Sequence, residues 1–210
     1  MLRISDYSKK YQDSVVLNIS DLHLPNGIFW LKGTNGSGKS TLLKSLAGIL
    51  HFDGNVILNE QISLKKDAIA YRTIVNFAPA DPIYPDFLSG EEMIRMFAAA
   101  KSGSLQQAEK YLSEMDMNSY IKDELGSYSS GMLKKLSLVL SFLGHPKLIL
   151  LDEPLITVDA DSLKVLFSWI REKQEQDNCS FIIASHQVIE DKELEITSIL
   201  SVQNQSVQFI

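Results

Sequence analysis

One short run limits the possible folds of this 210-residue chain more than any other: Gly33-Thr34-Asn35-Gly36-Ser37-Gly38-Lys39-Ser40-Thr41. It fits the pattern G-x-x-x-x-G-K-[ST] of a phosphate-binding loop. The glycines allow a tight turn and bring backbone N–H groups close to a phosphate without an intervening Cβ atom. In such a loop Lys39 reaches the β- and γ-phosphates, and the Ser40 hydroxyl binds Mg²⁺. A helix that begins at about Ser40 would direct its positive end at the same phosphates.

The segments on either side of the loop agree with this interpretation. The apolar run Ile28–Leu31, opened by Gly27, predicts a buried strand before the loop. After the loop, Leu42, Leu43 and Leu46 recur at helical spacing. Because a phosphate-binding loop joins a strand to a helix, this context favours the functional interpretation over a chance match.

Composition and charge exclude several classes of protein. A net charge of −6 argues against a nucleic-acid surface, which usually carries a basic stripe. The single cysteine, Cys179, excludes an internal disulfide and fits a reducing compartment. No apolar run approaches the ~20 residues that span a bilayer, and residues 1–6 contain no signal-peptide core. We therefore expect one soluble, cytoplasmic domain that reaches a membrane only through a partner.

Short apolar runs and polar breaks predict the organisation of the first part of the chain. Strands are expected at residues 2–4, 15–19, 22–24, 56–58 and 73–77, with turns near Lys9-Lys10 and over residues 51–55. Tyr11 lies between two of these strands. Two interpretations of it are equally supported: a half-buried strand aromatic, and a flat surface on which a base stacks.

The composition changes at Ser89. Ser89-Gly90-Glu91-Glu92 fits a capping box, and Ser104 with Gln107 repeats its spacing before a second helix. A longer helix is expected from about Ser130 to Leu143. We therefore expect residues 89–144 to form a helical subdomain inserted into a core made of residues 1–88 and 145–210.

A second cluster of candidate site residues follows another apolar run. Leu148–Leu151 predicts a buried strand of a parallel sheet, and such strands present functional residues at their carboxyl ends. Asp152 is placed there to hold Mg²⁺, and Glu153 to polarise an attacking water. His186 follows the apolar run 180–184 in the same way and could bridge a γ-phosphate and a water. The alternative is that these side chains have only structural roles at strand ends.

Tyr128-Ser129-Ser130-Gly131-Met132 precedes the long predicted helix. Hydroxyl groups and unpaired backbone N–H groups at a helix start favour an anion site. The same residues also fit plain N-capping by Ser129 or Ser130, and the two interpretations are compatible.

Taken together, these motifs resemble the ATP-binding subunit of ABC transporters over nearly the whole chain. The order is Tyr11, a Walker A loop at 33–41, a signature at 128–132, a Walker B strand at 148–152 followed by Glu153, a D-loop ending in Asp159, and a switch histidine at His186. The resemblance implies an α/β P-loop NTPase core with a mostly parallel sheet flanked by helices, an N-terminal antiparallel β subdomain and a helical signature subdomain.

The resemblance also implies a mechanism with ATP and Mg²⁺ as ligands. Two subunits, expected to be a homodimer, meet head to tail and enclose two ATP molecules, so that each Walker A loop faces the partner's signature. Closure on ATP and opening after hydrolysis would drive a separate transmembrane permease, with this chain peripheral on the inner face of the cell membrane.

The resemblance assigns a role to each matching residue. Glu153, His186 and Lys39 are the expected catalytic residues, and Ser40 and Asp152 the metal ligands. Tyr11 is expected to stack on adenine, Ser129 and Gly131 to touch the γ-phosphate across the dimer, and Asp159 to join the two sites. The expected nucleotide-binding residues are Tyr11, Gly33, Asn35, Gly36, Ser37, Gly38, Lys39, Ser40, Thr41, Ser129, Ser130, Gly131 and Asp159.

Two positions depart from the family pattern. Ala80 stands where the family has a glutamine that reaches Mg²⁺ and the attacking water, and Asp81 beside it is a candidate substitute. Ser130 replaces the first glycine of the signature and adds a Cβ atom near the phosphate. We therefore expect intact ATP binding and slow hydrolysis. A soluble ABC-type ATPase outside transport and a regulatory nucleotide-binding subunit are the alternative functions, while the sequence leaves the substrate and the direction of transport open.

Overall fold

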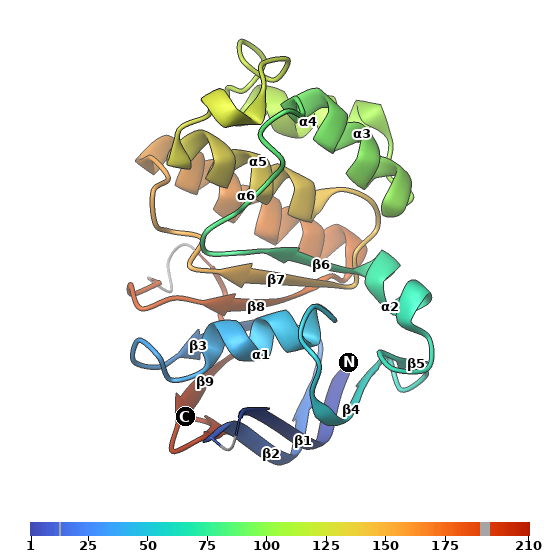
Figure 1. Ribbon diagram of the computed structural model, residues 1–210, viewed down its shortest axis with the longest axis vertical. Coiled ribbons are helices and arrows are strands. Elements are labelled where there is room, and N and C mark those ends of the chain that lie inside the picture. The colour runs from blue at the N-terminus through green and yellow to red at the C-terminus, as the bar shows by residue number, and fades with distance from the viewer. Residues whose placement is uncertain (13, 190–193) are drawn as a thin grey trace.

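The computed structural model describes residues 1–12, 14–189 and 194–210 as two β-sheets and a set of helices (Figure 1). The first sheet is antiparallel, with strand order β2-β1-β4-β5. The second has the order β10-β9-β3-β8-β7-β6, and only its edge strand β10 is antiparallel to its neighbour. The strands are β1 (Leu2–Tyr11), β2 (Ser14–Leu24), β3 (Ile28–Lys32), β4 (Asp53–Leu58), β5 (Ile62–Ser63), β6 (Val75–Ala78), β7 (Leu148–Asp152), β8 (Ser180–Ala184), β9 (Ser198–Gln203) and β10 (Ser206–Phe209).

The helices cover both faces of the mostly parallel sheet. Figure 1 shows α5 and α6 on one face, with α3 and α4 beyond them, and α1 on the other face toward the antiparallel sheet. The helices are α1 (Lys39–Leu46), α2 (Ala68–Ile74), α3 (Gly90–Ala100), α4 (Leu105–Glu114), α5 (Ser130–Phe142) and α6 (Ala160–Asp177), with a 3₁₀ turn, η1, at Leu125–Ser127. This arrangement confirms the predicted fold class.

Side chains of the central strands alternate between two hydrophobic cores. Ile149 and Leu151 of β7 belong to the core under α5 and α6, whereas Leu148 and Leu150 belong to the core around α1 and the antiparallel sheet. Burial on both faces explains why β7 is a continuous apolar run rather than an alternating one.

The antiparallel sheet differs from the prediction in three places. The strands expected at 15–19 and 22–24 are one continuous strand, β2, which pairs with β1 through the polar residues between them. The expected turn at Lys9-Lys10 is wrong, because β1 continues to Tyr11 with only a register shift between these two lysines. The expected turn over 51–55 is also wrong at its end, because β4 begins at Asp53. Gly54, with φ of 95°, faces a second irregularity at Asp6, whose carbonyl oxygen would lie 2.2 Å from a Cβ atom at this position. Turn-forming residues here mark bulges rather than chain reversals.

The expected strand 73–77 begins two residues later than predicted. Thr73 and Ile74 belong to α2, a short helix absent from the prediction, and β6 starts at Val75. In α2 only Tyr71 is fully buried, so the segment has too little apolar periodicity to be recognised in the sequence.

The helix starts agree with the sequence signals. The Ser89 hydroxyl accepts a hydrogen bond from the Glu92 backbone, and the Glu92 carboxylate accepts one from the Ser89 backbone N–H at 2.8 Å, which confirms the capping box. Ser104 caps α4, and Ser129 caps α5. In the part of the chain that the structure describes, no helix has both the length and the hydropathy required to span a bilayer.

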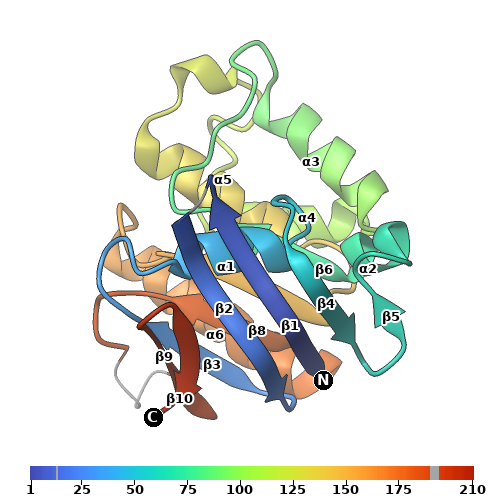
Figure 2. The same ribbon diagram turned by 60° about the horizontal axis from the view of Figure 1, so that its bottom comes forward.

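Figure 2 shows the strands β1, β2 and β4 beside the C-terminal hairpin β9–β10, whose predicted turn lies at Asn204-Gln205. The Asn18 backbone N–H donates to the Gln205 carbonyl at 2.7 Å. This contact joins the antiparallel sheet to the edge of the mostly parallel one, on the side of the glycine-rich loop.

Candidate nucleotide site

The glycine-rich loop joins β3 to α1, as the sequence predicts. Gly38 caps α1 in the left-handed region with φ of 107°, and a Cβ atom there would lie 3.0 Å from the Leu17 side chain of β2. Gly36 also has a positive φ, of 78°, with no atom within 4 Å of the place where a Cβ would stand. The loop therefore packs closely against β2 at Gly38, whereas the space beside Gly36 is open.

Lys39 is almost fully buried, with 6% of its surface exposed. Its ammonium group donates to the Gly33 and Thr34 carbonyls at 2.9 and 3.2 Å, and so folds back along the loop. A cavity of about 290 Å³ lies over this position. Its lining residues are Asn35, Gly36, Gly38, Lys39, Ser40, Thr41 and Glu153.

Asp152 ends β7 beside the start of α1 and is 1% exposed. Burial raises the pKa of its carboxyl group, while the Ser40 hydroxyl and the Lys134 ammonium group act in the opposite direction. One carboxylate oxygen of Asp152 and the Ser37 hydroxyl are buried and lack a hydrogen-bond partner among the described residues. Such orphaned oxygens fit a site for a divalent cation and phosphate, and Mg²⁺ is commonly held by one or two protein ligands together with substrate phosphates.

Glu153 and His186 meet because β7 and β8 are parallel neighbours with Asp152 opposite Ala184. Glu153 has φ of 45°, and its N–H donates to the Ala184 carbonyl at 2.8 Å. Its carboxylate lies 3.0 Å from His186 Nδ1 and accepts from the His186 backbone N–H at 3.3 Å. The backbone turn thus aims the Glu153 side chain along the cavity and toward His186.

Ser129, Ser130 and Gly131 lie at the start of α5, and none of them lines the cavity over the glycine-rich loop. The Ser129 hydroxyl accepts from the Met132 N–H at 3.2 Å. A Cβ atom at Gly131 would lie 3.1 Å from the Thr157 carbonyl of the loop before α6. Within one chain, these predicted nucleotide contacts therefore do not meet the loop.

Asp159 caps α6, where its carboxylate accepts from the Ser162 N–H at 2.9 Å. It also pairs with the Lys135 ammonium group of α5 at 2.9 Å. The Ser162 hydrogen bonds and Lys135 hold the pKa of Asp159 well below its usual range. This pair ties the loop before α6 to the helix that begins at Ser129.

Tyr11 ends β1 with 49% of its surface exposed, so the structure leaves both interpretations of this strand aromatic open. It pairs with Ser14 across the hairpin, next to Val15 and Val16, which line a hollow shared with Gly33 and Gly36. The Lys9 ammonium group lies 4.7 Å from the centre of the Tyr11 ring. An exposed ring on this side of the loop is available for stacking, which stays a prediction.

Ala80 and Asp81 follow β6. Asp81 lines a separate groove and not the cavity over the glycine-rich loop, so the geometry gives no support for Asp81 as a substitute for the expected glutamine. The Ala80 carbonyl oxygen, in contrast, accepts a hydrogen bond from Lys134.

Two residues that the sequence did not indicate, Lys134 and Trp30, form hydrogen bonds to backbone carbonyls beside the site. Lys134 is 1% exposed beneath the strand ends, although a lysine pair on a helix usually indicates a solvated face. Trp30 of β3 donates from its indole N–H to the Ser185 carbonyl at 3.1 Å, next to His186. No pattern in the sequence identifies either contact, because both depend on the packing of distant elements.

A parallel sheet with a glycine-rich loop between β3 and a helix, and acidic residues at the end of β7, one strand beyond the neighbour of β3, defines a P-loop nucleotide-binding domain. The sequence pattern of the ABC transporter family matches residues 17–156. The chain belongs to the ABC transporter family and is an ATPase of that family.

Curated relatives agree with this assignment. The cytochrome c biogenesis ATP-binding export protein CcmA of Legionella pneumophila is 31% identical over 188 residues, which are 89% of this chain and 93% of that protein. The ABC transporter ATP-binding protein YtrB of Bacillus subtilis is 30% identical over 194 residues, or 90% of this chain and 64% of that protein. ABC transporter A family member 2 of Arabidopsis thaliana is 32% identical over 169 residues, but the match spans only 17% of its length.

Solved structures confirm the fold. An ATP-binding subunit of an ABC transporter superposes with a TM-score of 0.88 at 24% identity, covering 99% of this chain and 88% of that one. A dimeric ATP-binding cassette protein in a post-hydrolysis state, bound to ADP and Pi, superposes with a TM-score of 0.82 at 16% identity, covering 99% and 97%.

Proposed function

We propose that this chain binds and hydrolyses MgATP as a head-to-tail dimer and energises a transmembrane permease on a separate chain. The observation that carries the proposal is a cavity at the strand ends that the glycine-rich loop and Glu153 line together. His186 Nδ1 lies 3.0 Å from the Glu153 carboxylate, and the buried Asp152 lies beside the Ser40 hydroxyl. The signature residues lie outside that cavity, which supports a site that a second subunit completes.

Each residue of the cavity has a task that its position supports. The N–H groups of the loop and the start of α1 bind the phosphates, with Lys39 turning from the loop carbonyls to the β- and γ-oxygens. Ser40 and Asp152 would hold Mg²⁺, which would neutralise charge on the phosphate oxygens. Glu153 accepts a proton from the attacking water, and His186 orients the Glu153 carboxylate from 3.0 Å.

Across the dimer, the partner subunit would contribute the start of its own α5, with the Ser129 hydroxyl and the N–H of Gly131, to the γ-phosphate. Tyr11 would stack on the adenine, and Asp159 would link the two sites. In this arrangement residues 89–144 form the subdomain that carries the signature, and the rest of the chain forms the core.

Because Ala80 has no side chain able to reach the water or the metal, Glu153 works without the amide that the family pattern supplies. We therefore expect hydrolysis to be slow but measurable. The regulatory alternative, a subunit that binds nucleotide and does not hydrolyse it, predicts no turnover at all.

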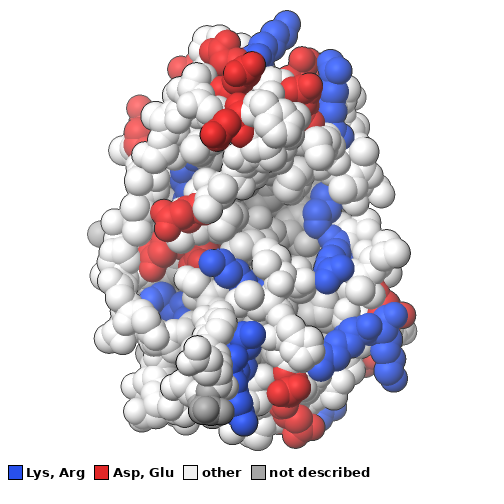
Figure 3. Space-filling view, viewed as in Figure 1, with Lys and Arg blue, Asp and Glu red and all other residues white. Residues whose placement is uncertain are grey.

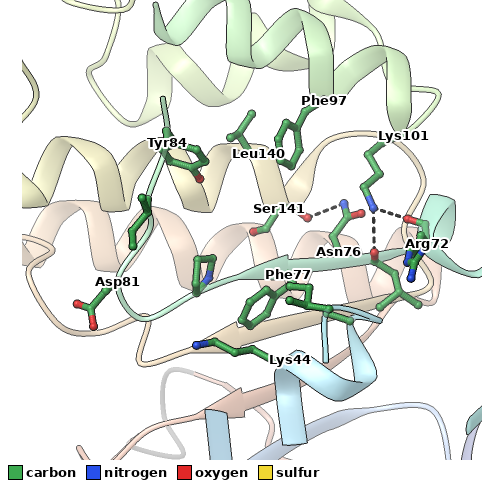
Figure 4. A pocket seen from close by; sticks show the side chains of 15 residues that line it. Lys44, Arg72, Asn76, Phe77, Asp81, Tyr84, Phe97, Lys101, Leu140 and Ser141 are labelled. Carbon is green, nitrogen blue, oxygen red and sulfur yellow. Dashed lines mark hydrogen bonds between the residues drawn. The ribbon is translucent and has the colours of Figure 1, made fainter. Parts of the chain in front are cut away.

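The permease is proposed to dock in a groove of about 380 Å³ between α1, β6 and α3. Figure 3 shows this face hollowed, with Lys and Arg side chains beside the hollow. Apolar side chains line much of the groove, and three basic residues, Lys44, Arg72 and Lys101, complete the lining together with them (Figure 4). Ile83, 90% exposed, belongs to the same lining. An apolar groove with basic groups suits an amphipathic helix that carries carboxylates, and such a partner would hold the chain at the inner membrane surface.

The test of hydrolysis compares the wild type with Glu153→Gln and Lys39→Ala under saturating MgATP. Removal of the base is expected to lower kcat by about a hundredfold or more while ATP still binds. Lys39→Ala is expected to abolish nucleotide binding. Equal rates for the wild type and Glu153→Gln would overturn the role of Glu153. Unchanged ATP affinity in Lys39→Ala would overturn the phosphate site.

A further inference from the structure

Lys134 lies about one turn into α5, yet it is among the most buried charged residues described, at 1% exposure. Its ammonium group donates to three backbone carbonyls: Pro79 at 2.8 Å, Asp152 at 2.9 Å and Ala80 at 3.2 Å. An ammonium group has three N–H donors and no acceptor, so these three bonds use all of them.

All three carbonyls lie just beyond the end of the pairing between β6 and β7. β6 and β7 are paired in parallel up to Ala78 and Leu151, and beyond this point the chain after β6 leaves the sheet. The Asp152 carbonyl therefore lacks a ladder partner on that side, as do those of Pro79 and Ala80. Buried carbonyls without donors are costly, and one lysine satisfies all three.

These carbonyls belong to, or directly precede, residues of the proposed site, so Lys134 contacts the backbone that carries the proposed catalytic groups. Asp152 carries the carboxylate proposed to hold Mg²⁺, Glu153 follows it with φ of 45°, and Ala80 is where the family pattern has its glutamine. The carboxylates of Asp152, Asp81 and Glu153 all attract the Lys134 ammonium group. The same lysine thus contacts the backbone on both strands that end at the site, from the helix that begins with the signature.

We propose that Lys134 is a positioning residue for ATP hydrolysis, which fixes the backbone of Asp152-Glu153 against that of Pro79-Ala80 and connects both to α5. The proposal rests on the proposed function of Glu153 and Asp152. The methyl side chain of Ala80 cannot form a hydrogen bond to the end of β7. Lys134 instead connects the two positions, because its ammonium group binds both the Ala80 and the Asp152 carbonyl.

The test is Lys134→Met, which keeps an unbranched apolar stem and removes the three donors. Lys173→Met is the matched control, because Lys173 is also buried, at 7% exposure, and pairs with Asp177 near the opposite ends of the strands. Both variants lose a buried ammonium group, and both are expected to be less stable to heat. Steady-state ATPase kinetics, the Mg²⁺ concentration at half-maximal rate and ATP binding without Mg²⁺ are measured on each folded protein.

A positioning role predicts that Lys134→Met lowers kcat at least about tenfold and raises the Mg²⁺ concentration at half-maximal rate, with ATP binding within about threefold of the wild type. Lys173→Met is expected to keep kcat within about twofold. If Lys134→Met retains the wild-type kcat, or if Lys173→Met lowers kcat equally, the proposal is overturned. If Lys134→Met does not fold, Lys134→Gln, which retains two N–H donors, takes its place with the same criteria.

Glu153→Gln is measured in parallel so that two failures can be separated. An active Glu153→Gln enzyme contradicts the proposed function, whatever Lys134 does. An inactive Glu153→Gln enzyme beside a fully active Lys134→Met enzyme contradicts the role of Lys134 alone.

Discussion

At the scale of single residues, the site depends on backbone geometry as much as on side-chain chemistry. Glu153 reaches the cavity because its φ of 45° turns the chain at the end of β7. A non-glycine residue in this region is uncommon, and such conformations concentrate at functional sites. His186 holds the resulting carboxylate at 3.0 Å. Because Ala80 lacks the glutamine side chain of the family pattern, we expect Glu153 to activate the proposed water without that amide.

Asp159 allows a prediction about stability and pH. Its carboxylate caps α6, and its folded-state pKa lies below that of an ordinary carboxyl group. The stabilisation is therefore complete above the unfolded pKa of about 3.9 and is lost as the pH falls through the lower folded value. Asp159→Ala is expected to lower the free energy of unfolding by about 1 kcal/mol at neutral pH, measured with urea.

The matched control is Asp161→Ala, since Asp161 lies in the first turn of α6, its side chain is 90% exposed, and its one ion pair among the described residues is with Lys164. Its effect is expected to stay within about 0.5 kcal/mol. The difference in the free energy of unfolding between Asp159→Ala and the wild type should become smaller below about pH 4. If this difference in the free energy of unfolding did not change with pH, the charge of Asp159 would make no contribution to stability.

At the scale of elements, the groove beside β6 supports a prediction about the partner. Ile83→Asp places a charge on an apolar residue of the groove lining that is 90% exposed. The variant is expected to lose co-purification with a membrane-embedded partner, while the ATPase rate of the isolated chain stays within about twofold. Leu105→Asp, on an exposed residue of α4 outside the groove, is the control. Equal partner recovery with both variants would contradict docking in the groove.

The elements that the sequence predicted well are those with a local signal. Ser89 and Ser104 mark helix starts because a capping hydroxyl is needed there, and the run 148–151 marks a strand buried on both faces. The prediction failed where the outcome depends on distant packing. Lys9-Lys10 resembles a turn, but the pairing of β1 with β2 and β4 keeps it in a strand.

The same distinction holds for the candidate site. The loop residues 33–41 and the pair Asp152-Glu153 are recognisable because their chemistry needs those residue types at adjacent positions. The burial of Lys134 under Pro79, Ala80 and Asp152 is not recognisable, because three separate segments create it. Sequence spacing also gave no guide to the direction of Asp81, which lines the groove instead of the cavity.

At the scale of the whole molecule, the loop cavity and the signature lie apart. Ser129 and Gly131 begin α5 and do not line the cavity that contains Lys39 and Glu153. Under the proposed function, a single chain would therefore offer two half-sites. The Lys135–Asp159 pair connects α5 to the loop before α6, and the Lys134 contacts connect it to the end of β7. Under the proposed function, these contacts would link the two half-sites of one chain.

The central claim is that ATP joins two copies of this chain through the signature. The most direct measurement is sedimentation velocity of the Glu153→Gln variant with and without MgATP, because this variant is expected to bind ATP and to hydrolyse it very slowly. We expect a monomer without nucleotide, a dimer with MgATP, and a monomer again when Ser129→Arg is added. Unchanged sedimentation on addition of MgATP, or a dimer that Ser129→Arg leaves intact, would contradict the claim.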